Sequence, residues 1–201
     1  MSQRSFETIQ ALPPSPARTA AIAAWFQGLY PAARDAPVLV GGAAVELYTR
    51  GSYTTGDLDF VGDIPPEIER ELKRVGFVKT GRHWVHRRGH IFIELPARAF
   101  DRETRTDIVV FGRWSVLVLA PEDLLVDRLA AWKFWKVVVE GVNAFLLWQE
   151  RGAEMDPSWL DKLARKEGLT EALCSLRSFA AQTEKVDPGI ERVEEWARSV
   201  R

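Results

Sequence analysis

The spacing of apolar residues changes once along this chain, near Ala120 and Pro121, and this change limits the folds it can adopt. Before it, short runs rich in β-branched residues alternate with helical segments, a pattern typical of an α/β unit. After it, apolar residues recur every three to four positions, which predicts helices. We therefore expect an α/β (α+β) fold, with a small mixed sheet flanked by helices and followed by a helical C-terminal region.

Three parts are expected along the chain. Residues 1–36 form an N-terminal segment and helix, residues 37–120 the α/β core, and residues 121–201 a helical region packed on that core. The proline-rich stretch at 12–16 predicts a spacer after a loose N-terminal segment. Apolar spacing, with glycine and proline at the boundaries, predicts helices at 17–30, 43–49 and 65–74, and strands at 38–40, 57–61, 77–87, 90–95 and 114–119.

Composition excludes several classes of protein. The chain has 201 residues, 46% of them hydrophobic, and a formal net charge of -1. Such a balance argues against a protein whose main role is to coat nucleic acid. The uncharged apolar runs are far shorter than the roughly 20 residues of a membrane span, and no signal-peptide pattern is present, so we expect a cytoplasmic protein. The single cysteine, Cys174, cannot form an internal disulfide and is expected to be a small core residue.

The most informative pattern is a glycine pair separated by fourteen residues from two aspartates. A strand that ends at Gly41-Gly42 and runs into a helix presents backbone N–H groups that suit a phosphate. On the next strand, Asp57 and Asp59 point to the same side, about 6.6 Å apart along the chain. Two such carboxylates repel each other unless a cation lies between them, and Mg²⁺ prefers oxygen ligands. The pattern predicts a phosphate cradle beside a metal-binding strand, although a solvated turn would also accommodate both acids.

A third acid, Glu94, is the lone charge in an apolar strand. It must face solvent, be paired, or bind metal, because burial of an unpaired carboxylate is costly. A hairpin with Arg88-Gly89 as its two-residue loop would place His83 opposite Glu94. The surrounding basic stretch includes Arg87, Arg88 and an aromatic residue, which suits either an acceptor-binding surface or a solvated hairpin tip.

These residues resemble the minimal nucleotidyltransferases of the DNA polymerase beta superfamily. More closely, they are similar to bacterial nucleotidyltransferase-like proteins related to abortive-infection (AbiEii-type) toxins. The resemblance rests on VLVGGAAVELYTRGSYTTGDLDFV from Val38, SVLVLAPEDLLVDRLAAWKFW from Ser115 and DPSWLDKLARKEGL from Asp156. It implies a Mg²⁺-dependent transfer of a nucleoside monophosphate from an NTP to a hydroxyl of an RNA 3′ end, a protein or a small molecule. It also implies a toxin or defence role with an antitoxin partner. From the short apolar runs we expect no association with a membrane.

The resemblance assigns roles to particular residues. Asp57 and Asp59 would hold two Mg²⁺ ions, and Glu94 would join one of them and position the acceptor hydroxyl. Gly41, Gly42 and Ala43 would hold the triphosphate of the NTP. Further contacts to the nucleotide are expected from Thr55, Arg128 and Lys133, and contacts on the acceptor side from His83, Arg87 and Arg88. For Arg128 and Lys133 the alternative is a solvated helix face.

Two other functions fit parts of the pattern. The Asp57-Leu58-Asp59-Phe60-Val61 run also matches the nucleophile motif of haloacid-dehalogenase-type phosphatases, but that fold needs an apolar strand that ends at its first aspartate. The second alternative is a non-catalytic nucleotide-binding or regulatory toxin-antitoxin partner with the same fold. Metal-dependent nucleotide binding without transfer would favour that alternative.

Overall fold

A computed structural model describes residues 3–183 and 188–199. Contacts within the chain divide it into two units, Met1–Ala120 and Pro121–Arg201. The first unit contains α1 (Gln3–Gln10), α2 (Pro16–Gln27), the 3-10 helix η1 (Ala33–Asp35), β1 (Val38–Val40), α3 (Gly41–Tyr48), β2 (Asp57–Val61), α4 (Pro66–Arg74), β3 (Val78–Thr80), β4 (His83–His86), β5 (Ile91–Ala97), β6 (Thr106–Phe111) and β7 (Trp114–Leu119). The second contains α5 (Pro121–Trp135), α6 (Val138–Arg151), α7 (Pro157–Lys166), α8 (Thr170–Thr183) and α9 (Gly189–Ser199).

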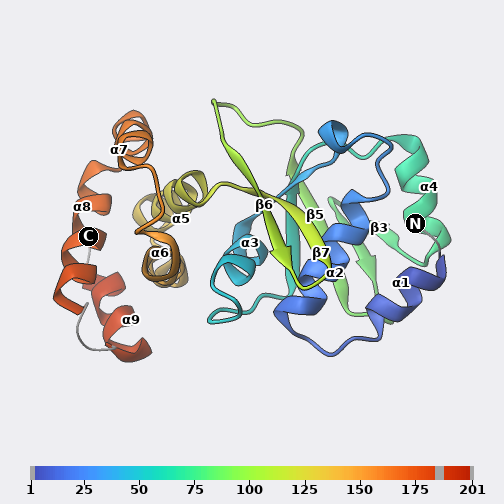
Figure 1. Cartoon of the computed structure of the whole chain (residues 1–201), viewed down its shortest axis with the longest axis horizontal. Helices are drawn as coiled ribbons and strands as arrows, with labels where there is room; N and C mark the ends of the chain where they lie inside the picture. Colours follow the sequence, from blue (N-terminus) through green and yellow to red (C-terminus); the bar gives the residue numbers. More distant parts are fainter. Residues whose placement is uncertain (1–2, 184–187, 200–201) are drawn as a thin grey trace. The chain divides into compact units, whose positions relative to one another are not determined.

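The first unit is built on one seven-stranded mixed sheet, with the strand order β3-β4-β5-β2-β1-β7-β6 (Figure 1). β1 runs parallel to β7, and β2 runs parallel to β5. The remaining neighbours are antiparallel. Helices flank this sheet, as expected from the sequence, so the predicted fold class is confirmed.

The pleat of β2 separates its apolar and acidic residues onto two faces. Leu58 and Phe60 are buried, whereas Asp57 is exposed and Asp59 is partly buried. Phe60 packs against Phe26 of α2, with ring centroids 4.9 Å apart. Apolar and acidic residues alternate along β2, as the sequence predicts, and this alternation places Leu58 and Phe60 in the core.

The predicted strand at 77–87 is wrong, because this stretch folds as two short strands. β3 and β4 form an antiparallel hairpin, with Thr80 paired to His83. Gly81 lies in the turn at a φ of +60°, a backbone conformation that glycine adopts without steric cost. β6 was not predicted at all. It is an edge strand on which Ile108 and Val110 are exposed, so it lacks the buried face that makes a strand recognisable.

The prediction of a loose N-terminal segment is also wrong, because residues 3–10 form α1. Phe6 and Ile9 lie three residues apart on one side of this helix and are both buried. The Phe6 ring lies 4.3 Å from Trp25 of α2 and 5.1 Å from His86 of β4, measured between centroids. Burial of these two side chains holds α1 on the sheet unit, although the helix is only two turns long.

The second unit is entirely helical in the part that the structure describes. Its core contains an aromatic cluster in which Trp196 lies 4.6 Å from Trp132 and 4.8 Å from Phe179, measured between ring centroids. In the same unit, Trp159 Nε1 donates a hydrogen bond to the buried Asp123 Oδ2 at 2.9 Å. Cys174 is exposed on α8, so the prediction of a core cysteine is wrong.

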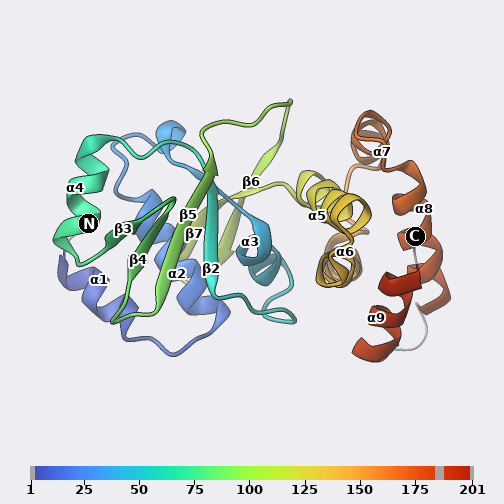
Figure 2. The ribbon, with the colours of Figure 1, turned by 180° about the vertical axis from the view of Figure 1, so that it is seen from behind.

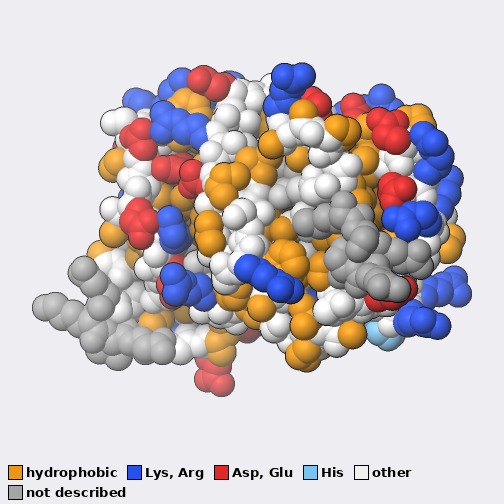
Figure 3. All heavy atoms as spheres, turned by 45° about the vertical axis from the view of Figure 1, so that its right-hand side comes forward, with side chains coloured by type: hydrophobic (Ala, Val, Ile, Leu, Met, Phe, Trp, Pro, Cys, Tyr) orange, Lys and Arg blue, Asp and Glu red, His pale blue; other side chains and the backbone are white. Residues whose placement is uncertain are grey.

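Among the described residues, no helix is both long enough and apolar enough to cross a membrane. Basic and acidic side chains are interspersed over the face seen in Figure 3, with small apolar patches between them. This mixture reflects the near balance of 27 Lys and Arg against 28 Asp and Glu.

The burial of His86 makes the stability of the sheet unit depend on pH. Burial lowers the pKa of His86 below its usual 6.5, and its Nδ1 accepts a hydrogen bond from Gly89 N–H at 3.0 Å. The unfolded chain therefore takes up a proton near pH 6.5 while the folded chain resists it. We expect the contribution of His86 to the free energy of unfolding to be constant above this pH and to fall as the pH drops below it.

Urea unfolding at pH 7.5 and 5.5 measures this dependence. His86→Phe removes the titrating group from the aromatic cluster, so the difference between the two pH values should shrink. His90→Asn, at an exposed turn position with a φ of +48°, is the matched control and should keep the wild-type difference. An unchanged difference in His86→Phe would contradict the prediction.

Candidate active site

The junction between β1 and α3 has no intervening loop. α3 begins at Gly41, directly after Val40, and Gly41 has a φ of +67°. Val40 has no capping side chain, so no side chain of the N-cap residue satisfies the N–H groups of the first turn. Such N–H groups, at the positive end of the helix dipole, favour an anionic ligand.

Asp59 lies against this junction. Val40 is paired with Asp59 in the β1–β2 register. A Cβ built on Gly41 would lie 2.5 Å from Oδ2 of Asp59, closer than real Cβ contacts come. A Cβ on Gly42 would lie 3.2 Å from the Tyr53 ring and 3.3 Å from the Thr55 side chain. Gly41 therefore brings the start of α3 close to Asp59, and Gly42 brings it close to Tyr53 and Thr55.

The loop before Asp57 is held by a residue that sequence analysis missed. Glu46 of α3 is almost fully buried and accepts hydrogen bonds from Thr55 N–H at 3.4 Å and from Thr19 Oγ1 at 3.2 Å. Burial raises the pKa of Glu46, and the bond from Thr55 opposes that rise. A lone charge in the apolar run at 43–49 was the available signal, since a buried carboxylate must find partners.

Glu94 lies beside Asp59 on the neighbouring strand. The β2–β5 register pairs these two residues, and the β4–β5 register pairs Glu94 with His83, which confirms the predicted register of that hairpin. The Glu94 side chain is only 13% exposed. Its Oε1 lies 2.6 Å from Arg82 Nε, and its Oε2 lies 2.8 Å from His83 Nε2. Of the alternatives left open by the sequence, the structure has Glu94 paired. The sequence did not point to Arg82 as a partner of Glu94, because a turn residue carries no periodic signal.

The donor set at β2 suits a hard divalent cation. Two carboxylates project from the same face of one strand, and one of them is exposed. Carboxylate oxygens are the ligands that Mg²⁺ prefers, so Asp57 and Asp59 fit the ion in chemistry. Within the described residues, no three side chains of His, Cys, Asp or Glu lie close enough together to hold a metal ion. Glu94 would have to exchange its ion pairs for a metal to become a third ligand.

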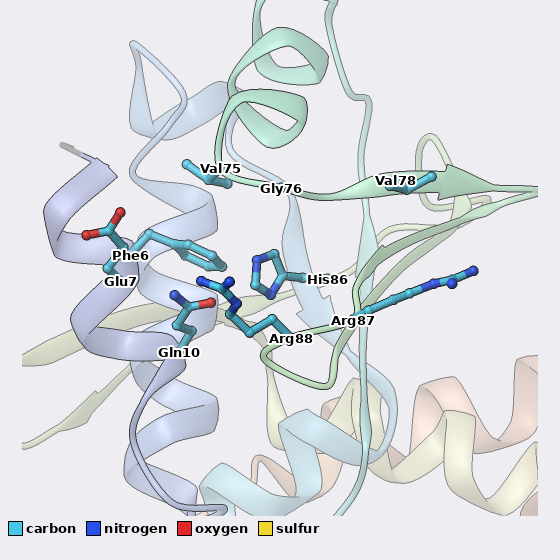
Figure 4. A pocket seen from close by; sticks show the side chains of 9 residues that line it. All are labelled: Phe6, Glu7, Gln10, Val75, Gly76, Val78, His86, Arg87 and Arg88. Atoms are coloured by element: carbon cyan, nitrogen blue, oxygen red, sulfur yellow. The ribbon is translucent and has the colours of Figure 1, made fainter.

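The residues predicted for the acceptor side do not form one group. His83 lies at the start of β4, beside Glu94. Arg87 and Arg88 follow the other end of that strand and, with α1, line a cavity of about 380 Å³. In Figure 4 the Arg88 side chain extends toward Gln10 and His86, whereas Arg87 points away from them. Only His83 therefore reaches the acids directly.

Arg128 and Lys133 belong to α5, in the second unit. Arg128 Nη1 lies 2.8 Å from Glu140 Oε2, and Lys133 Nζ donates to the backbone oxygen of Gly168 at 2.9 Å. Both cations are thus engaged within their own unit. Their contact with nucleotide phosphates stays a prediction.

One solved structure resembles this chain in fold. It is described as an antigenic nucleotidyltransferase-like protein from Paracoccidioides brasiliensis. The match has a TM-score of 0.52 at 15% sequence identity and covers 68% of this chain and 78% of the other. The chain has a nucleotidyltransferase-like fold. No model of a known protein family and no curated protein sequence matches it.

The nucleotidyltransferase-like fold gives the acids a different setting from the phosphatase alternative. Asp57 is the first residue of β2, and the apolar residues of that strand follow it. A phosphatase of the haloacid-dehalogenase type needs the opposite order, with the strand ending at its first aspartate. The relation to abortive-infection toxins has no counterpart among these matches and stays a prediction.

The close approach of Asp59 to Gly41 can be tested by substitution with a matched control. Gly41→Ala should lower the free energy of unfolding both through its positive φ and through collision with Asp59. Gly112→Ala, in the β6–β7 turn at a φ of +59° with open space around it, carries only the first penalty, about 1–2 kcal/mol. Urea unfolding should show the larger loss for Gly41→Ala. Equal losses for the two variants would mean that Asp59 does not press on the helix terminus.

Proposed function

We propose that this protein is a Mg²⁺-dependent nucleotidyltransferase that moves a nucleoside monophosphate from an NTP to a hydroxyl of an acceptor. The observation that carries the proposal is the pairing of β1 with β2, which sets the carboxylate of Asp59 against the Cβ-free terminus of α3 at Gly41. A site for negatively charged phosphate and a pair of oxygen ligands thereby adjoin each other. The nucleotidyltransferase-like fold supports this reaction class.

In this proposal, separate residues bind the triphosphate and the metal ions. Backbone N–H groups of Gly41, Gly42 and Ala43 bind the triphosphate, and Thr55, beside Gly42, contacts the same ligand. Asp57 and Asp59 would hold two Mg²⁺ ions, with Glu94 as a further ligand once it leaves its ion pairs. These ions, when bound, activate the attacking oxygen and stabilise the leaving pyrophosphate. Arg128 and Lys133 are proposed as further phosphate contacts.

The transfer forms one bond and breaks one. The hydroxyl oxygen of the acceptor bonds to the α-phosphorus, and the bond from that phosphorus to the oxygen leading to the β-phosphate breaks. Pyrophosphate leaves, and the hydroxyl proton passes to solvent. Glu94, next to Asp59 in register, would orient that hydroxyl.

A second candidate function is a non-catalytic nucleotide-binding or regulatory partner in a toxin-antitoxin pair. The specific observation in its favour is that Arg82 and His83 occupy the carboxylate of Glu94. If that carboxylate never leaves these partners, nucleotide would bind and no transfer would follow. The toxin or defence role, and an antitoxin partner, rest on the sequence resemblance of the segments that begin at Val38, Ser115 and Asp156.

The direct experiment incubates the protein and Mg²⁺ with each α-³²P-labelled NTP and separated RNA, protein and small-molecule fractions of a cell lysate. Label in one fraction would support transfer and show the acceptor class. Saturable nucleotide binding with no label in any fraction would support the non-catalytic alternative.

Asp57→Asn tests the metal-binding role of the exposed acid. Transfer should fall by about 10²–10³ or more, because one electrostatic element of the reaction is lost. The melting temperature without metal should hold or rise, since the substitution removes one of two neighbouring like charges. Asp107→Asn, on the edge strand β6, is the control carboxylate and should keep full transfer. A large drop in melting temperature for Asp57→Asn would instead indicate a structural role.

A further inference from the structure

In the described part of the first unit, the side chains on one face of β3, β4, β5 and β2 are exposed or partly exposed, and we call this the open face. On the other face, α1, α2 and α4 pack against these strands: Phe6 contacts His86, Phe26 contacts Phe60, and Lys73 lies over Trp84. Figure 2 views the open side, with these four strands in front of α2. The open face carries the side chains of alternate residues, including the acids of β2.

Strand register arranges these side chains in two adjacent rows that end at the acids. The apolar row runs through paired positions Val78, Val85 and Phe92 to Asp57. The polar row runs through Thr80, His83 and Glu94 to Asp59. Each row crosses four strands, so an apolar strip and a hydrogen-bonding strip lie side by side next to the acids.

The apolar row is accessible. Val78 is 59% exposed and Phe92 is 36% exposed, while Val85 between them is partly exposed. Phe92 is thus an exposed aromatic side chain in the middle of a strand, level with Asp57. Exposed aromatic rings on a sheet are how several RNA-binding folds stack unpaired bases.

The order of the strands separates the two substrates. The α3 terminus at Gly41 follows β1, which lies on one side of β2, and β5 lies on the other. If phosphate binds at Gly41, the acceptor must approach from the β5 side. The two rows are the surface it meets there.

We propose that the acceptor is the 3′ end of a single-stranded RNA, a proposal that rests on the nucleotidyl-transfer function above. Its terminal base stacks on Phe92 and packs on Val85, and its ribose hydroxyls face the polar row at His83 and Glu94. Arg87 directly follows β4, is exposed and points away from Gln10 and His86 in Figure 4, which suits a contact with a backbone phosphate. The surface thus offers neighbouring contacts for an aromatic base, for vicinal hydroxyls and for a phosphate, and a ribonucleotide carries all three groups.

Fluorescence anisotropy with a 5′-labelled twelve-nucleotide RNA tests the surface. Phe92→Ala should weaken RNA binding roughly 5- to 150-fold, the effect of losing one stacked base. Phe92→Tyr keeps an aromatic ring and should bind within a few-fold of wild type. Ile108→Ala, on exposed β6, is the control for removal of an exposed apolar strand residue and should bind as wild type. Wild-type binding by Phe92→Ala would overturn the proposal.

The salt dependence of RNA binding gives a second measurement. Arg87→Ala should reduce the slope of log affinity against log salt concentration by about 0.7, the contribution of one phosphate contact on a single strand. A blunt RNA duplex should bind worse than the single strand, because its bases are already stacked. Equal binding of the duplex, or label transferred to protein and not to RNA, would overturn the assignment.

Calorimetric titration of each NTP with Mg²⁺ into the wild-type protein separates this proposal from the one on which it rests. If an NTP binds and RNA does not, the RNA surface fails and the nucleotide site stands; label transferred to a protein or small-molecule fraction then shows that nucleotidyl transfer holds without an RNA acceptor. If RNA binding depends on Phe92 while no NTP binds, nucleotidyl transfer fails and the RNA surface stands.

Discussion

The contact between Asp59 and the start of α3 is the constraint on which the candidate active site depends. Antiparallel pairing of β1 with β2 sets Val40 opposite Asp59, and the chain turns into a helix at the very next residue. No side chain fits between the carboxylate and that turn. Glycine at position 41 therefore serves two purposes, a left-handed backbone angle and the absence of a Cβ. Asp59 can lie against the start of α3 only because Gly41 both adopts a positive φ and has no Cβ.

Charge balance around the acids is the second organising feature. Glu94 is largely shielded from solvent; Arg82 supplies the opposite charge that a shielded carboxylate needs, and His83 Nε2 lies 2.8 Å from its other oxygen. Asp57, at the exposed end of β2, has no such requirement. The acids thus differ in environment although they share one sheet face. The same arrangement therefore supports both a catalytic and a purely nucleotide-binding hypothesis. Catalysis requires that a metal ion replace Arg82 and His83 as the partner of Glu94.

The strand order gives the site a direction. The phosphate-binding feature lies on the β1 side of β2, and the open face of β5, β4 and β3 lies on the other. Asp57 and Asp59 are each paired in register with residues of β5, β4 and β3. The two acids therefore lie at one end of a surface that spans four strands. An edge strand such as β6 offers exposed apolar residues as well, but without acids or cations arranged in register beside them.

Local sequence was enough to determine the features that depend on period and on special residues. The alternation along β2 sets which side chains enter the core, Gly41 marks the end of β1, and the hairpin register that puts His83 opposite Glu94 follows from counting outward from the turn. Only the tertiary structure decided how distant segments meet. The packing of Phe6 on His86, the burial of Glu46 beneath the loop before Asp57 and the pairing of Arg82 with Glu94 all join residues whose contacts leave no periodic trace. The physical reason is that period records which side of an element is buried, whereas the partner across the gap is chosen by chain topology and by the need to neutralise each buried charge.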